Sequence, residues 1–300
     1  SEAVELAQRI ANEGRSTVEL GSGRADDSDD LHVASPAIEI RWPLAPRLMG
    51  HAGWRTDLAH DAVVSTGVMR LSAGARYRFG PAWTAYATGA HFSFDGGFGR
   101  PWGGELGVIN RPLDHVRLEA VMVREPIVTR RSLENGISLL QWVGAGDWTA
   151  FPRLTLHADA RAGFYSDGNR NEHTSAFARV QTYSSRRTDL SLQVGLEQLK
   201  AHQDLDHGYY DPAFHREWGP SALLEWRPAP HWTLGGALQT GWQRDKGDLA
   251  TSFYGLSGRV TLIPDADWTL SLEGWHGDSD LQSAGGYRRT WWQLSVLRGF

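Results

Sequence analysis

The chain ends in the residues TWWQLSVLRGF, which occupy positions 290–300. Chain ends are usually polar, frayed and expendable, but this one alternates apolar and polar residues and stops on an aromatic residue, Phe300. Alternation with a period of two predicts a β-strand with one apolar and one polar face. We therefore expect Trp292, Leu294 and Val296 to face apolar surroundings, with Phe300 at the edge of the apolar zone.

The same alternation runs through most of the chain after residue 14. In residues 189–199, DLSLQVGLEQL, every second residue is Leu or Val, and residues 267–275, DWTLSLEGW, repeat the pattern. The alternating runs last about 10–13 residues, whereas strands of soluble proteins usually have about 5–6. A tilted transmembrane strand needs about 9–11 residues. These lengths predict strands that cross a membrane.

Short and long connections alternate between the runs. Tight turns such as NRPLDHVRL and IPDADWTL recur at a spacing typical of one long hairpin per unit, and longer polar segments lie between them. A β-propeller has a similar repeat, but its short strands do not fit such long runs. We predict an all-β, up-and-down transmembrane barrel of about 16 strands over residues 15–300. Aromatic residues beside the short turns predict a membrane-interface girdle: Trp42, Phe79, Trp83, Trp148, Phe151, Trp226, Trp232 and Trp268.

The first residues have a different pattern. Residues 1–14, SEAVELAQRIANEG, place apolar side chains at helical spacing between a potential Ser cap and a Gly stop. This pattern predicts a short helical stub, which we interpret as the end of a helical region that precedes the barrel.

The composition narrows the functional class. The net charge of -5 and pI near 6.2 argue against a nucleic-acid partner. The absence of Cys excludes disulfides and thiolate metal sites. No H-E-x-x-H or G-x-S-x-G motif is present, so we predict no enzyme, no catalytic residues, no cofactor and no metal site. Acidic residues are frequent near the long loops, for example Asp26 and Asp278, and the negative potential they create would attract cations.

Strand parity predicts which side chains face the lumen. If the apolar residues of each strand point to lipid, the intervening residues point inward and give a wet channel with mixed charge. Many of these charges would pair across the lumen wall. The candidate channel-lining residues are Glu39, Glu105, Glu119, Asp159, Glu197, Glu225, Glu273, Arg41, Arg161, Trp275 and Trp291.

Two segments carry a resemblance to a known family. Residues 207–218, HGYYDPAFHREW, are similar to the G-Y-Y-x-P segment in the C-terminal barrels of exopolysaccharide export proteins, and RRSLENGI at 130–137 resembles a stretch before a mid-barrel strand of these proteins. The motif residues are Gly208, Tyr209, Tyr210, Asp211 and Pro212. Asp211 replaces the Ser expected in the cellulose type, which argues against that type. The chain resembles the Pel type first, and the poly-N-acetylglucosamine and cellulose types next.

The resemblance implies a periplasmic tetratricopeptide region followed by an outer-membrane porin domain. It implies passive export of a hydrophilic exopolysaccharide for a biofilm matrix, with a cationic, partly deacetylated amino-sugar polymer as cargo. Expected partners are that polymer, outer-membrane lipid, the helical repeats of the same chain, other export components and the barrel insertion machinery, which would read Phe300. The long loops would be extracellular, the termini periplasmic, and the Tyr209–Tyr210 loop a gate. A general or sugar-specific diffusion porin is the alternative.

Overall fold

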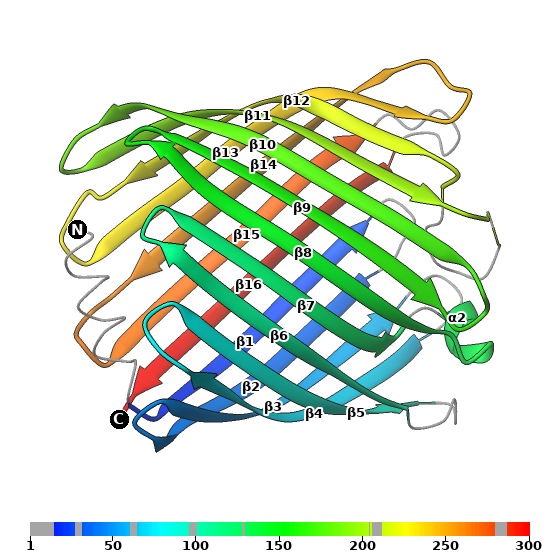
Figure 1. The fold of residues 1–300 in the computed structure, drawn as a ribbon, viewed down its shortest axis with the longest axis horizontal. Helices are drawn as coiled ribbons and strands as arrows, with labels where there is room; N and C mark the ends of the chain where they lie inside the picture. The colour runs from blue at the N-terminus through cyan, green and yellow to red at the C-terminus, as the bar shows by residue number, and fades with distance from the viewer. Residues whose placement is uncertain are drawn as a thin grey trace.

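The computed structural model describes residues 15–27, 32–60, 65–95, 101–127, 130–203, 205, 212–279 and 287–300. These residues form sixteen antiparallel strands that close into one barrel, in which every strand pairs with its neighbours in sequence and β1 pairs with β16 (Figure 1). This confirms the predicted up-and-down barrel. The strands are β1 (Thr17–Asp27), β2 (His32–Ala45), β3 (Leu48–His60), β4 (Ser65–Arg78), β5 (Trp83–Phe94), β6 (Trp102–Leu113), β7 (Val116–Pro126), β8 (Ser138–Phe151), β9 (Leu154–Tyr165), β10 (Arg170–Ser184), β11 (Thr188–Ala201), β12 (His215–Trp226), β13 (Trp232–Asp245), β14 (Thr251–Leu262), β15 (Trp268–Ser279) and β16 (Tyr287–Gly299).

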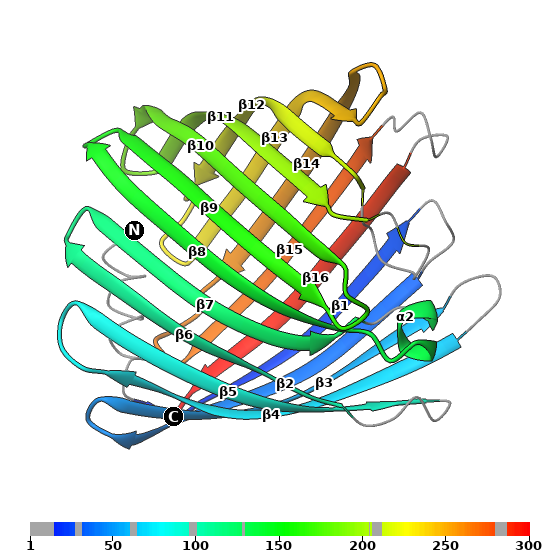
Figure 2. The same cartoon turned by 45° about the vertical axis from the view of Figure 1, so that its right-hand side comes forward.

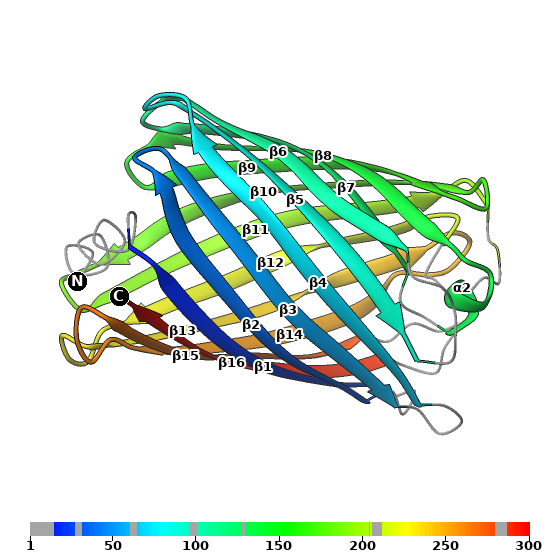
Figure 3. The same ribbon diagram turned by 90° about the horizontal axis from the view of Figure 1, so that it is seen from below.

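The two ends of the barrel differ in the length of their connections. At one end, called the turn end below, strands are joined by tight connections such as residues 46–47 and 152–153. At the other, the loop end, the connections include residues 127–137 and 202–214. The C-terminus lies at the turn end, and the strands are strongly tilted across the barrel (Figures 2 and 3). The predicted segregation of turns and loops is confirmed.

The C-terminal strand closes the wall. Thr17 of β1 faces Gly299 of β16, and the N–H of Phe300 donates a hydrogen bond to the carbonyl of Ser16 at 2.9 Å. Closure leaves no open sheet edge, which is the requirement for a β-structure in lipid. The predicted pairing of the last strand with the first is therefore confirmed.

One residue of β16 breaks the apolar pattern of its outer face. Arg298 lies on the same face as Val296, where lipid-facing strands usually carry an apolar or aromatic residue. Its guanidinium carbon lies 4.9 Å from the ring centre of Trp268 and 4.8 Å from that of Phe300. Two cation–π contacts therefore cover the charge at the turn end, where water is close.

The outer face of the wall is apolar. On β11, Leu192, Val194 and Leu196 are 52%, 59% and 47% exposed, whereas the intervening Gln193 is only partly exposed. The concave inner face crowds its side chains, so these exposed apolar residues point outward, while inward charged residues such as Glu197 are exposed to the lumen. On β16 the same alternation places Trp292 and Leu294 outward, as predicted.

Two aromatic girdles flank this apolar face. The predicted girdle at the turn end includes the exposed Trp83, Trp148, Trp226 and Trp232. A second girdle near the loop end was not predicted, because its residues do not sit beside tight turns. It contains Trp102, Trp142, Trp242 and Trp292. Paired girdles are typical of barrels that span an outer membrane.

The helical elements differ from those expected. The predicted stub, residues 1–14, lies outside the described residues. A short helix that we did not predict, α2 (Arg130–Glu134), occurs in the connection between β7 and β8. Gly136 ends it with a φ of 64°, and its N–H bonds the carbonyl of Leu133 at 3.0 Å. No helix in the described parts of the chain has the length and apolarity to cross a membrane.

The two faces of β16 predict opposite responses to a new charge. Replacing Leu294 by Arg places a guanidinium against lipid and should destabilise the inserted barrel by about 2 kcal/mol or more. The neighbouring Gln293→Arg change places the same group in the lumen and should cost little. Urea unfolding in lipid vesicles measures both. Equal destabilisation by the two changes would contradict this assignment of the faces.

Candidate channel lumen

The eleven candidate channel-lining residues all lie on the inner face. Residues that face each other in adjacent strands share a face, so the ladder from Glu19 to Glu39 to Gly53 runs along one side of the wall. The apolar neighbours of Glu39, Ile38 and Ile40, are exposed on the other side. The same alternation places Glu105, Glu119, Asp159, Glu197, Glu225, Glu273, Arg41, Arg161, Trp275 and Trp291 inward.

Several of these carboxylates are held by arginine. Arg41 contacts Glu39 at 2.5 Å and Glu19 at 3.5 Å. Arg227 reaches both Glu225 and Asp189.

A second group of pairs follows the same rule. Arg117 pairs with Glu119, which also accepts a hydrogen bond from the hydroxyl of Tyr86 at 3.1 Å. Asp159 receives Arg161 at 3.0 Å. As predicted from the sequence, many charged residues of the lumen form ion pairs with neighbouring residues of the wall. Such pairs are locally neutral and contribute less to a net field than isolated charges do.

Histidines bridge the carboxylates on one side of the lumen. His157 Nδ1 lies 2.7 Å from Asp147, and its Nε2 lies 3.5 Å from Asp159. Beyond Asp159, His173 follows at 3.7 Å and contacts Glu197 at 2.7 Å. These five residues form a continuous imidazole–carboxylate chain across β8, β9, β10 and β11.

The chain of acidic groups extends onto two further strands. Glu197 faces Glu217 directly across the β11–β12 pair. The buried His215 then bridges Glu217 at 3.0 Å and Asp245 of β13 at 2.6 Å. Like charges opposite each other destabilise a sheet, so the Glu197–Glu217 pair is not explained by stability. No group of three or more ligand side chains in the described residues has the geometry of a metal site.

The opposite wall is richer in arginine, although Arg55 there contacts Asp57 at 2.8 Å. Arg55 on β3 faces Arg70 on β4, and Arg76 follows on the same face of β4. In a closed ring of sixteen strands, β3 and β4 lie eight places from β11 and β12 (Figure 1). Arg70 and Arg76 extend over the rings of Phe92 and Tyr86, each at 5.7 Å. The lumen therefore carries an acidic wall and a basic wall, and a transverse field between them.

Two tryptophans lie side by side on the lumen wall. Trp275 of β15 faces Trp291 of β16 in the strand register. The indole of Trp275 lies close to Gly255 and Gly277, where a Cβ at Gly255 would approach the indole nitrogen to 3.1 Å and one at Gly277 would overlap the ring. Both glycines therefore leave room for the ring on the lumen wall.

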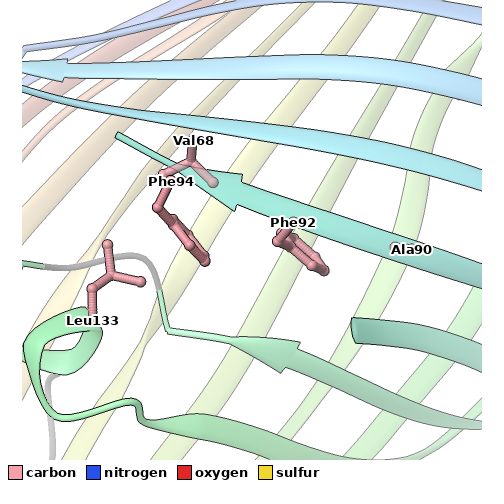
Figure 4. Close-up of a cluster of buried hydrophobic side chains, with 5 residues drawn as sticks. All are labelled: Val68, Ala90, Phe92, Phe94 and Leu133. Atoms are coloured by element: carbon pink, nitrogen blue, oxygen red, sulfur yellow. The ribbon is translucent and has the colours of Figure 1, made fainter. Parts of the chain in front are cut away.

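A segment at the loop end enters the lumen. Val68, Phe92 and Phe94 belong to the inner faces of β4 and β5, and they form a buried cluster with Leu133 of α2 (Figure 4). Leu133 is 5% exposed, and Ile137 in the same connection is 2% exposed. Because the partners of Leu133 point inward, the β7–β8 connection must fold into the mouth of the barrel and narrow it.

The segment predicted to be a gate lies mostly outside the described residues. Gly208, Tyr209, Tyr210 and Asp211 are outside the described residues, so their role stays a prediction. Of this motif only Pro212 is described, and its carbonyl accepts a hydrogen bond from the N–H of Ala201 at 2.8 Å. The segment RRSLENGI, which contains α2, was predicted only to resemble a stretch of the exporter family. The sequence signal for its burial is an apolar pair, Leu133 and Ile137, within a polar loop.

A variant that displaces α2 from the barrel wall tests whether this helix narrows the mouth of the channel. Leu133→Asp removes about 2 kcal/mol of apolar burial and adds a carboxylate that has no place among Phe and Val side chains. We expect the connection to leave the wall and the single-channel conductance in planar bilayers to increase.

The matched control is Leu249→Asp, which adds the same charge at the same end on a side chain that is 78% exposed. Its conductance should equal that of the wild type. A conductance that is unchanged in Leu133→Asp would show that α2 does not limit the pore.

Comparisons with known proteins agree with the fold. The sequence matches no protein-family model and no curated protein. Among solved structures, the chain is similar to "Bacterial polysaccharide outer membrane secretin", with a TM-score of 0.83 and 15% identity over 96% of this chain and 99% of that one. It is less similar to CdiB from Acinetobacter baumannii (TM-score 0.61, 9% identity, 94% of this chain and 60% of that one) and to the CymD monoaromatic hydrocarbon channel (0.52, 10%, 100% and 92%).

The fold is that of a bacterial outer-membrane β-barrel. At these identities the similarity concerns the fold alone, and it supports an outer-membrane location.

Proposed function

We propose that this barrel is an outer-membrane channel for the export of a hydrophilic exopolysaccharide, with a cationic, partly deacetylated amino-sugar polymer as cargo. The main support is the whole-length similarity in fold to a polysaccharide secretin, whose TM-score of 0.83 contrasts with 0.52 for a hydrocarbon channel. In this proposal the long loops are extracellular and both termini periplasmic. Helical repeats of the same chain and other export components deliver the polymer from below.

The acidic wall is the part of the lumen suited to such a cargo. Glu197 and Glu217 face each other on adjacent strands, and each contacts a histidine, His173 for Glu197 and His215 for Glu217. A row of carboxylates binds ammonium and hydroxyl groups weakly and at many sites. A polysaccharide can therefore bind to the wall and still slide along it. The arginines of the opposite wall repel the ammonium groups and hold the polymer against the acidic side.

Transport of this kind needs no covalent chemistry. We therefore propose a passive channel without catalytic residues, cofactor or metal. Phe300 is proposed as part of the signal for the barrel insertion machinery, since it ends the closing strand at the turn end.

The acidic wall gives the first test. Replacing Glu197 and Glu217 together by Gln removes two negative charges and keeps the side-chain shapes. Secretion of a cationic polymer should fall in a complementation assay, and the preference of the open channel for cations over anions should decrease.

The control replaces the outward-facing Asp26 and Asp278 by Asn, which changes charge outside the lumen. Normal secretion by the lumen variant, with normal barrel insertion, would refute the role of the acidic wall. A strain in which the intact gene restores solute uptake but secretes no polymer would instead indicate a general or sugar-specific diffusion porin.

The aromatic pair gives a second test. The indole of Trp275, on the inner face opposite Trp291, is proposed as an apolar platform on which the flat face of a sugar ring can stack. Trp275→Ala should remove about 1 kcal/mol of this interaction, or roughly a fivefold shorter block of the ion current by amino-sugar oligomers. Trp292→Ala on the outer face should leave the block unchanged. Equal block times for all three proteins would exclude stacking on Trp275.

A further inference from the structure

The outer face of four neighbouring strands carries exposed cations near the loop end. We call Arg170 of β10, Lys200 of β11, Arg216 of β12 and Arg244 of β13 the basic patch. Arg216 faces Arg244 directly in the strand register, and Gln198 faces Arg216 from the other side. All four cations are exposed and alternate with inward residues such as His215 and Asp245, so they point away from the lumen.

The basic patch begins where the apolar band ends. Trp218 and Trp242, which face each other, each lie two residues from Arg216 and Arg244 on the same outer face. The turn-end girdle on these strands contains Trp226 and Trp232. Strands that rise about 3.3 Å per residue at a tilt of about 40° put roughly 20–25 Å between the two girdles, which equals the height of a barrel's apolar band. Arg216 and Arg244 therefore lie at the depth of lipid headgroups.

Among the described residues, carboxylates are few around the patch. Within the described residues, the outer faces of these four strands near the loop end carry one carboxylate, Glu172, which faces Lys200. Arg216 donates to the neutral Gln198 at 2.8 Å and stacks on Phe214 at 5.2 Å.

Two arginines elsewhere on the loop-end rim have carboxylate partners. Arg24 contacts Asp26 at 2.9 Å, and Arg288 contacts Asp278 at 3.5 Å. Two directly opposed arginines without a carboxylate cost stability, as do any like charges in facing positions. An external anion would remove that cost.

The surface next to the arginines is also hollowed. A cavity of about 220 Å³ lies between β9, β10 and β11, and its outward lining includes Ala162, Phe164, Arg170, Glu172 and Lys200. It combines an aromatic ring with two cations and one carboxylate. A ligand with an acyl or sugar part beside a phosphate matches this lining better than a free ion does.

We propose that the basic patch binds the phosphate groups of lipids in the leaflet on the loop side of the membrane. Guanidinium groups bind phosphate through paired, charge-assisted hydrogen bonds. Cations just outside the apolar band are placed to recognise anionic headgroups, while Trp218 and Trp242 contact the lipid below them. The proposal depends on the outer-membrane location and is independent of what passes through the lumen.

The test measures lipid retained by the purified barrel in detergent by native mass spectrometry. The probe is lipid A with both phosphates, and the comparison probe is lipid A without them. The fraction of the double variant Arg216→Gln/Arg244→Gln that retains the phosphorylated lipid should be roughly tenfold lower than that of the wild type. Wild-type protein should prefer the phosphorylated lipid by a similar factor.

Two controls separate this proposal from general effects of charge. Arg24→Gln, whose arginine already has Asp26 as partner, should retain lipid like the wild type. The pair Arg170→Gln/Lys200→Gln changes the other half of the patch and replaces the first double variant if that one fails to fold. Heat-induced band shifts report folding in each case.

Three results would overturn the proposal. Equal retention of both lipids by the wild type, or undiminished retention by a folded patch variant, overturns the proposal. Inorganic phosphate that displaces the lipid at equimolar concentration would show a free-anion site and would also overturn it. Polymer secretion is not a readout, so failure here leaves the export proposal untouched.

Discussion

Backbone hydrogen bonding in the absence of water is the constraint on which this structure depends. In lipid, every N–H and C=O must find a partner within the protein, and a β-sheet meets this requirement only when its first and last strands pair. Here the pairing of β1 with β16 satisfies it, from Thr17 opposite Gly299 to Asp27 opposite Arg289. The aromatic and apolar end of the chain is the sequence consequence of this closure.

Closure fixes two faces with separate chemistry. Each strand presents alternate residues to lipid and to the lumen, and the register carries each assignment from strand to strand around the ring. The lumen wall and the lipid-facing surface are therefore built from the same strands without interfering with each other. On β12, Glu217 contributes to the acidic lumen wall while its neighbour Arg216 belongs to the outer basic patch. One residue of register shift would exchange the two and place charges in lipid.

The faces were predictable because alternation is a local property. Parity in the sequence assigned Glu197 and Trp275 to the inner face and Leu294 to the outer face, and the register agrees. What a charge does on its face was not predictable. Glu225 and Glu197 look alike in sequence, but the first is tied to Arg227 and the second belongs to a chain of imidazoles and carboxylates that crosses several strands. These contacts join residues of different strands, and their distances depend on the stagger between strands.

The sequence by itself determined the class of structure: strands long enough to cross a membrane, an apolar outer face, turns at one end and a strand that closes the ring. These features follow from local periodicity and from the physics of burying a backbone in lipid. Only the tertiary structure decided that α2 enters the mouth of the barrel, that acidic and basic walls face each other, and that Arg216 and Arg244 meet on the outer surface. Each of these depends on side chains brought together across strands, and a period of two along one strand carries no information about the partner that the barrel places beside it.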